Sequence, residues 1–185
     1  QIDSIAQSWS VLSGVADPER ARHAMDALAT RLVHAEHGLV QLLDPPFDRH
    51  GPNPGYIGGY VPGVRENGGQ YTHAALWMAM AMARKGDGGR AVQLLRLLNP
   101  IEHARDAEAV WHYGVEPYVV AADVYRLPGR IGQGGWSWYT GSAGWMHRLF
   151  VESLLGLQLE HGGERGAWLR LEPRLPQAWP GFELT

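Results

Sequence analysis

The chain has 185 residues, of which 45% are hydrophobic, so it is long and apolar enough for one folded domain with a sizeable core. The formal net charge is -3 without a basic block, which excludes an electrostatic nucleic-acid surface, and no cysteine is present for a disulfide or a thiolate metal site. The longest apolar run, Ala74–Ala83, is about half of the roughly 20 residues of a membrane span, and no signal pattern occurs at the start.

Two helix pairs are predicted in the first half of the chain. In each pair, a helix that is apolar nearly all round precedes an amphipathic helix. The first amphipathic helix has Asp17 as N-cap and Pro18 at the first helical position. The predicted pairs are 4–14 with 17–34, and 72–86 with 88–99.

Loops and a final helix make up the second half. A long loop, 35–71, separates the two pairs, and a second loop, 99–114, precedes the apolar segment 115–127. Residues 140–157 form the last clear helix. Beyond residue 165 the pattern changes to one or two short strands, so we expect a helical part over 1–160 and the start of a β element over 161–185.

A short phrase recurs with a constant spacing of 68 residues. A hydroxyl residue, predicted as an N-cap, is followed five positions later by tryptophan. Such a period is typical of repeated helical hairpins. Because fully apolar helices alternate with one-sided ones, we expect a mainly α fold, about half of an (α/α)6 toroid; an α-solenoid or a coincidence are the alternatives. The pairs are Ser4 with Trp9, Thr72 with Trp77 and Thr140 with Trp145.

Two of these helix starts carry residues suited to an anion. Thr72 and His73 open one helix, and Thr140 and Gly141 open another, where free N–H groups and the positive helix end favour negative charge. We therefore predict a shared phosphate pocket formed by His73, Thr140 and Gly141. The alternative is that the threonines are ordinary caps and His73 is a satisfied histidine near the core.

The glycine-rich loop before residue 72 suits sugar recognition. Arg65 and Glu66 can bond to hydroxyl pairs, and a tyrosine ring can cover an apolar sugar face. Gly68 and Gly69 let the backbone approach a ligand closely. A surface ion pair and a turn aromatic are the alternative. The candidate sugar-binding residues here are Tyr60, Arg65, Glu66 and Gln70.

The sequence gives less support for a general acid or base, a metal site or a nucleophilic serine. Glu116 and Asp123 are candidate general acids or bases, although Glu116 also fits a first helical turn beside Pro117. The nine histidines show no metal-ligand spacing, so no metal is expected. Ser142 lacks the preceding strand and glycine of a nucleophile elbow.

Three motifs resemble one enzyme family. The stretches ENGGQYTHAALW, GVEPYVVAADVYRLPGR and GGWSWYTGSAGWM are similar to the carboxy-terminal part of the catalytic domain of glycoside hydrolase family 94, and most similar to the phosphorylase-like domain of cyclic β-1,2-glucan synthases. The resemblance places His73, Thr140 and Gly141 at the phosphate positions. It places Arg65, Glu66 and Tyr60 on the acceptor-sugar side.

The resemblance also implies a reaction. Phosphate attacks the anomeric carbon of a β-glucan while one carboxylic acid protonates the leaving oxygen, which inverts the configuration and gives α-glucose 1-phosphate. The family's acid is an aspartate in a tryptophan-rich motif, which we expect upstream of Gln1. Phosphate is then a co-substrate and no cofactor is needed. Ala121 and Ala122 replace a glutamine of cellobiose phosphorylases, which favours a β-1,2-glucan.

Two other functions stay open at this point. An inverting glucan hydrolase would use Glu66 or Glu116, and a non-catalytic module would only bind glucan. The expected partners are β-glucan and phosphate, in the cytoplasm, with a parent protein anchored in the bacterial inner membrane. Half a ring would also leave apolar helix surface uncovered, which predicts self-association of the isolated chain.

Overall fold

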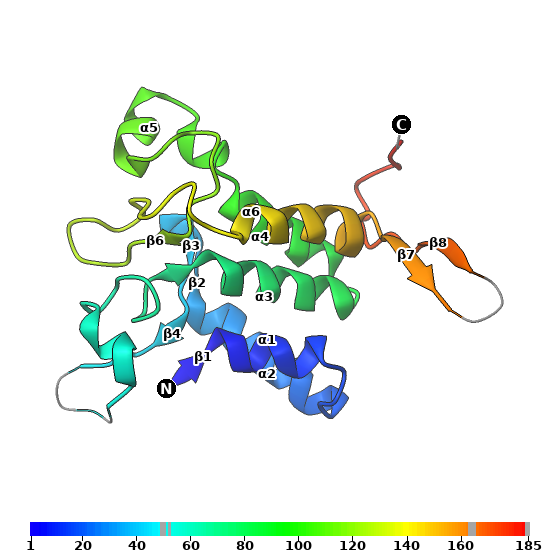
Figure 1. Cartoon of the computed structure of the whole chain (residues 1–185), viewed down its shortest axis with the longest axis horizontal. Coiled ribbons are helices and arrows are strands. Elements are labelled where there is room, and N and C mark those ends of the chain that lie inside the picture. The colour runs from blue at the N-terminus through cyan, green and yellow to red at the C-terminus, as the bar shows by residue number, and fades with distance from the viewer. Residues whose placement is uncertain (49–50, 52, 163–165, 184–185) are drawn as a thin grey trace.

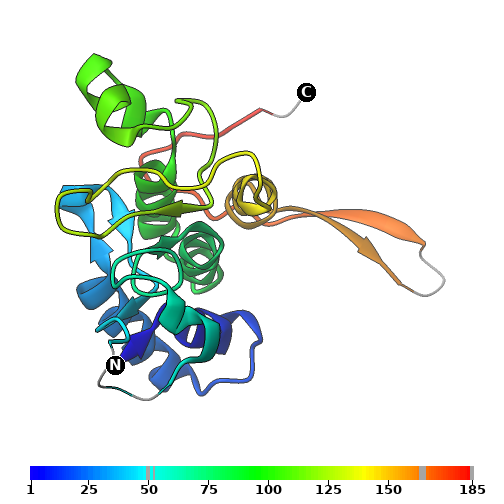
Figure 2. The same cartoon turned by 60° about the vertical axis from the view of Figure 1, so that its left-hand side comes forward.

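The computed structural model describes residues 1–48, 51, 53–162 and 166–183. Its body consists of two rows of helices (Figure 1). Helices α1, α3 and α6 lie side by side with their starts at the same end, and α2 and α4 lie against one side of this row (Figure 2). The mainly α class is confirmed, whereas closure into a toroid stays a prediction. The helices of the two rows are α1 (Ser4–Leu12), α2 (Pro18–Leu32), α3 (Thr72–Arg84), α4 (Gly88–Leu98) and α6 (Ser142–Arg148).

Carboxylates, rather than hydroxyls, cap the first two helices. The side chain of Asp17 accepts hydrogen bonds from the first turn of α2, as predicted, and Asp3 does the same for α1. Ser4 is therefore the first residue of α1 and not its cap. Thr72 is likewise the first residue of α3, whose N-cap position is held by Tyr71 without a side-chain hydrogen bond. The prediction of hydroxyl caps is wrong at both of these positions.

The recurring tryptophans mark equivalent places in the three parallel helices. Trp77 of α3 lies between Trp9 of α1 and Trp145 of α6. Each pair of rings meets edge to face, with centroids 5.5 Å apart. Such pairs contribute about 0.5–1.5 kcal/mol beyond their buried area. The 68-residue spacing thus corresponds to one step along the row.

Helix α3 is buried on nearly every side because it lies in the middle of the array. It packs against α1, α4 and α6. Its alanines let these helices approach closely, and Leu76 and Met78 fill the space between the rows. The continuous apolar run in the sequence is the consequence of this central position. The buried residues of α3 are Thr72, Ala74, Ala75, Leu76, Met78, Ala79, Ala81, Met82 and Ala83.

The region after α4 differs from the prediction. The expected loop 99–114 contains the 3₁₀ helix η3 (Glu102–Ala104) and helix α5 (Ala107–Tyr113). The apolar segment 115–127 is not helical and contributes turns and strand β6 (Asp123–Val124). Glu116 is therefore not in a first helical turn. The last helix changes after Arg148 to a π-helical stretch, η4 (Leu149–Leu154).

Short antiparallel strand pairs tie the loops together. Strand β6 pairs with β5, and a longer hairpin, β7 with β8, projects from the helices beyond η4 (Figure 2). This hairpin confirms strand structure near the C-terminus, and the expected boundary at 160/161 falls inside β7. The strands are β1 (Ile2–Asp3) with β4 (Leu43–Asp44), β2 (Val33–His34) with β3 (Leu39–Val40), β5 (Gln70–Tyr71) with β6, and β7 (Leu157–His161) with β8 (Ala167–Leu171). The remaining 3₁₀ helices are η1 (Ala35–His37) and η2 (Gly55–Gly59).

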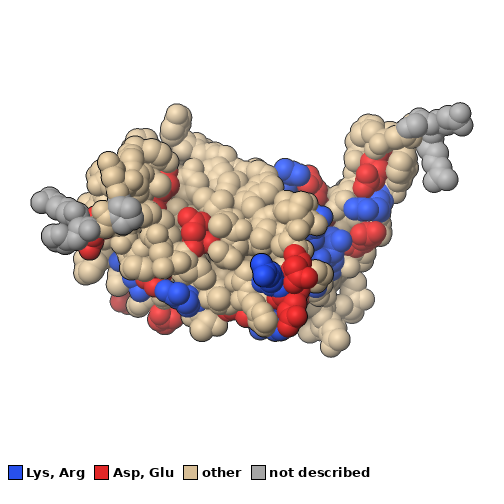
Figure 3. Space-filling view, turned by 90° about the horizontal axis from the view of Figure 1, so that it is seen from below, with Lys and Arg blue, Asp and Glu red and all other residues tan. Residues whose placement is uncertain are grey.

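Charge is unevenly distributed over the surface. Figure 3 shows basic and acidic side chains intermingled beside the projecting hairpin, while a broad area of the same face carries few charges. Arg148 pairs with Glu152 at 2.9 Å, and Arg170 pairs with Glu160 at 3.4 Å. Within the described part of the chain, no helix is long and apolar enough to cross a membrane.

The segment after β8 returns to the helices and packs tightly on the start of α4. A methyl group on Gly88 would overlap the carbonyl oxygen of Arg174, whereas one on Gly89 would meet nothing closer than an Asp87 oxygen at 3.8 Å. We expect Gly88→Ala to lower the free energy of unfolding by about 1–3 kcal/mol through overpacking. Gly89→Ala, in the same helical turn, should be neutral or stabilise by up to about 1 kcal/mol. Urea unfolding of both variants checks this, and equal effects would contradict the packing argument.

Candidate functional site

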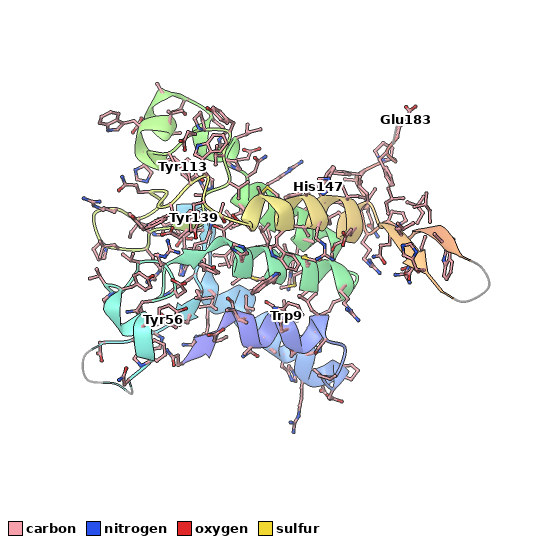
Figure 4. All side chains as sticks on the ribbon, in the orientation of Figure 1. Trp9, Tyr56, Tyr113, Tyr139, His147 and Glu183 are labelled. Carbon is pink, nitrogen blue, oxygen red and sulfur yellow. The ribbon has the colours of Figure 1, made fainter. Side chains whose placement is uncertain are left out.

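Three loop segments meet at the end of the molecule where α3 and α6 begin. They are residues 45–69, 114–127 and 128–141, and Tyr56 and Tyr139 from two of them lie at this end (Figure 4). Backbone hydrogen bonds join the segments to each other and to α3. These bonds run from Thr72 N to Ala122 O (2.9 Å), from Ala122 N to Trp136 O (2.6 Å) and from Arg126 N to Gly63 O (2.8 Å).

His73 and Gly141 lie next to each other although they are far apart in sequence. A methyl group placed on Gly141 would lie 3.0 Å from His73 Nε2. An added methyl group would press on the end of the imidazole, so the glycine gives His73 room at the start of α6. The starts of α3 and α6 are thus neighbours.

The surroundings of His73 favour a neutral ring. The Tyr71 ring stacks on it with centroids 5.1 Å apart, and Trp77 meets it edge to face at 6.3 Å. Partial burial disfavours the charged form and lowers the pKa of His73 below its ordinary value. The Nδ1 atom is shielded from solvent and has no hydrogen-bond partner among the described residues. A neutral imidazole in this position can donate one N–H to a ligand.

Thr140 belongs to a local hydroxyl network at the same helix start. Its Oγ1 accepts a hydrogen bond from the Ser142 backbone N–H at 3.0 Å. The Ser142 hydroxyl lies 2.7 Å away, and either oxygen can be the donor. Thr140 thus bonds to the first residue of α6, whose N-cap position is held by Gly141 without a side-chain hydrogen bond. When Ser142 is the donor, the Thr140 proton is still free for an anion.

Arg65 is held between two aromatic rings and two carboxylates. Its guanidinium carbon lies 5.7 Å from the Tyr60 ring centroid and 5.1 Å from that of Trp136. The nearest carboxylate oxygens of Glu66 and Asp123 are 3.5 Å and 3.7 Å from its nitrogens. The Arg65 and Glu66 side chains are only 20% and 16% exposed, so this is not the surface ion pair of the alternative interpretation.

The buried Asp123 carboxylate anchors this cluster. Burial raises the pKa of Asp123, while the Trp136 N–H and Arg65 oppose the shift. Its Oδ1 accepts a hydrogen bond from Trp136 N at 3.0 Å. A side chain on Gly135 would overlap the carboxylate, which explains the glycine at that position.

The turn itself requires glycine at positions 68 and 69. A methyl group on Gly68 would lie 2.5 Å from Pro46 Cγ, and one on Gly69 would lie 2.9 Å from Arg65 N. Gly68 also has a φ of 82°, which favours glycine. The expected backbone approach to a ligand at these two glycines stays a prediction. Their role is to allow the tight turn that presents Arg65 and Glu66.

Gln70 uses its side chain inside the protein. It is 2% exposed, its Oε1 accepts a hydrogen bond from Val40 N at 2.8 Å, and its Nε2 donates to Thr72 Oγ1 at 3.2 Å. These bonds join β3 to the start of α3. The geometry gives Gln70 a positioning role rather than an amide that faces a sugar.

Glu116 is held by the loop before α6. Its two oxygens accept hydrogen bonds from the Ser137 hydroxyl and from Trp138 Nε1, both at 2.7 Å. The Ser137 bond, backbone hydrogen bonding and the Trp138 bond lower the pKa of Glu116. An ionised carboxylate accepts hydrogen bonds from sugar hydroxyls but is a poor general acid at neutral pH.

Several residues of the site were missed or undervalued in the sequence. Trp136, Ser137 and Trp138 contact Arg65, Asp123 or Glu116, yet this stretch entered the prediction only as part of a family motif. The alternation of tryptophan and serine directly before a predicted anion site is the signal that could have identified them. Tyr71, which covers His73, carries no signal beyond its position next to it.

Comparisons with known proteins agree with the motifs. Residues 1–156 match the sequence model of the Glycosyl hydrolase 94 superfamily, catalytic domain. The chain is 51% identical over 182 residues to the cyclic beta-(1,2)-glucan synthase NdvB of Rhizobium meliloti (strain 1021), covering 98% of this chain and 6% of the synthase. It is 31% identical over 176 residues to a solabiose phosphorylase of Paenibacillus borealis, covering 94% of this chain and 22% of that enzyme.

A third relative has the same pattern of coverage. An N,N'-diacetylchitobiose phosphorylase of Vibrio proteolyticus is 32% identical over 185 residues, with 97% of this chain and 21% of the enzyme covered. The chain therefore spans about a fifth of the phosphorylases and a much smaller part of the synthase. With its family motifs in order over most of its length, the chain belongs to the Glycosyl hydrolase 94 superfamily, whose catalytic domain residues 1–156 match.

Proposed function

We propose that this chain supplies the phosphate and acceptor-sugar subsites of an inverting β-glucan phosphorylase-type domain. The observation that carries the proposal is the approach of the His73 imidazole to Gly141, where two helix starts meet beside the Arg65 cluster. The names of two relatives, both phosphorylases, support phosphate as the second substrate.

In this proposal His73, Thr140 and Gly141 hold the attacking phosphate. The neutral His73 ring, the Thr140 hydroxyl and the Gly141 backbone N–H each donate one hydrogen bond to it. Donors fixed before the reaction orient the phosphate oxygen toward the anomeric carbon. No protein base is needed, because phosphate is itself an anionic nucleophile.

The Arg65 cluster and Glu116 bind the acceptor sugar. Tyr60 and Trp136 offer ring faces for the C–H side of a glucosyl unit, and Arg65, Glu66 and Glu116 offer hydrogen bonds to its hydroxyls. Asp123 is enclosed and acts through Arg65 and Trp136. The similarity to a cyclic β-1,2-glucan synthase supports a β-1,2-glucan as the substrate, either for phosphorolysis or for control of chain length.

The general acid belongs, in our proposal, to a part of the enzyme outside these 185 residues. Glu116 is held in its ionised form, and Glu66 is paired with Arg65. Neither environment suits proton donation to a leaving oxygen, which also disfavours a hydrolase that uses either residue. Inorganic phosphate as co-substrate fits the cytoplasm, where we place this part of the protein.

The isolated chain should have no phosphorylase activity. General acid catalysis contributes typically about 10²–10⁴-fold, so β-1,2-glucan and phosphate mixed with the chain should give no glucose 1-phosphate above the blank. A coupled phosphoglucomutase assay measures this product. Glucose 1-phosphate released by the chain, and lost in Glu116→Gln, would show that the acid lies within these residues.

Anion binding should change the titration of His73. Sulfate is a suitable probe because it does not titrate near neutral pH. The free ring should titrate below about 6.5, and bound sulfate should raise this pKa by stabilising the imidazolium. Sulfate binding then takes up a proton, so the affinity should rise as the pH falls from about 7 to 5. NMR of the histidine ring signals measures both effects.

Two variants test the assignment. His73→Ala should weaken sulfate and phosphate binding by about tenfold or more, corresponding to the loss of one good hydrogen bond. His161→Ala, which removes an exposed histidine from the distant hairpin, should leave binding unchanged. If the two variants bind sulfate equally well, or if sulfate does not change the His73 pKa, the phosphate-site assignment fails. His73 is then a histidine near the core.

A further inference from the structure

Exposed aromatic side chains gather at one end of the molecule. Among the described residues, every large aromatic side chain that is more than half exposed comes from η2, from α5 or from the loops between α5 and α6. Solitary exposed apolar residues are ordinary, but a group of this size indicates a binding surface. The residues are Tyr56 (72%), Trp111 (88%), Tyr118 (69%), Trp136 (55%), Trp138 (68%) and Tyr139 (82%).

An open groove of about 680 Å³ lies beside part of this group. It is lined by Val110 and Trp111 of α5 and by Gln133 and Ser137 of the loop before α6. This volume lies within the range of pockets that bind small molecules. Figure 1 shows α5 standing apart from the helix rows, next to that loop.

The polar lining of the groove suits sugar hydroxyls. Glu116 lines it and is ionised, and its remaining lone pairs can accept hydrogen bonds from hydroxyl groups. The Gln133 amide offers both donors and an acceptor. A carboxylate and an amide beside the Trp111 ring are residue types that hold a saccharide, because a ring covers an apolar sugar face while the polar groups bond to its hydroxyls.

The loop 136–138 contacts both the Arg65 cluster and the groove residue Glu116. Trp136 carries the Arg65 guanidinium on its face, and Ser137 and Trp138, which follow it directly, donate to Glu116. The Trp138 ring in turn meets Tyr118 at 6.4 Å. A chain whose first unit lies on Arg65 and Trp136 can therefore pass Glu116 and reach Trp111.

We propose that this groove binds further glucosyl units of the acceptor glucan, beyond the unit held by Arg65 and Glu116, so that Trp111 selects long chains over short ones. The identity of the ligand rests on the proposed function; the groove and its exposed Trp111 do not.

The test measures how affinity depends on chain length. The 185-residue chain is titrated calorimetrically with β-1,2-linked gluco-oligosaccharides of two, three, four and six units. Affinity should rise with length in the unchanged chain. Trp111→Ala should weaken binding of the hexasaccharide by about tenfold, the size of one lost aromatic contact, and that of the disaccharide less than twofold. Glu116→Gln, which alters the proposed acceptor subsite as well as the groove, should weaken binding of every length.

Controls separate this proposal from the proposed function. Trp168→Ala removes a half-exposed tryptophan from the distant hairpin and should change nothing. If the acceptor subsite is correct, Arg65→Ala should weaken the binding of oligosaccharides of every length equally. If Arg65→Ala has no effect while Trp111→Ala still weakens the binding of long chains alone, the acceptor assignment fails and the groove proposal is supported.

Three results would overturn the groove proposal. The unchanged chain could bind none of the oligosaccharides at millimolar concentration, or Trp111→Ala could affect all lengths alike or none. A third is self-association in sedimentation that Trp111→Ala abolishes and glucan does not alter, which would make this surface a contact between proteins.

Discussion

The arrangement of the site depends on one buried carboxylate. Asp123 is fully enclosed, and an enclosed charge is costly unless it is paired and hydrogen-bonded. It lies opposite Tyr71 in the β5–β6 pair, accepts the Trp136 N–H and pairs with Arg65. A single group thus fixes the glycine-rich loop, the tryptophan loop and the start of α3 relative to one another, so that Arg65 and His73 belong to one rigid unit.

Different local environments give the neighbouring groups of the site different protonation states. Burial keeps His73 neutral, whereas two donors keep Glu116 ionised. Asp123, whose pKa burial raises, is enclosed and reaches no substrate directly. The described carboxylates near the site are therefore suited to binding and positioning, which is the physical reason for assigning proton donation to another part of the enzyme. Phosphorolysis needs only one such acid, because phosphate replaces the activated water of an inverting hydrolase.

The sequence predicted elements whose pattern is local and periodic. The amphipathic helix expected over 17–34 buries one side, with Ala21, Met25, Leu28 and Leu32, and the spaced tryptophans identify the parallel helices. Prediction from the sequence failed where tertiary contacts determine the local structure. Helix α5 buries only Tyr113, so it shows no apolar stripe, and the segment around Asp123 is apolar because loops cover it, not because it is a helix. The pairing of Asp123 with Arg65, 58 residues away, has no local signature.

The parallel direction of α1, α3 and α6 explains why the candidate site and the packed helices occupy different parts of the molecule. All three helix starts face one end, so the loops that enter them collect there, with their exposed aromatics. The two non-glycine residues with left-handed backbone, Arg65 (φ 47°) and Trp138 (φ 63°), lie among these loops in the described part of the chain. Such conformations are costly and persist only where surrounding contacts impose them. The ion pair with Asp123 holds Arg65 in this conformation, and the hydrogen bond to Glu116 holds Trp138. The backbone strain therefore lies at the two residues that flank the proposed path of the glucan.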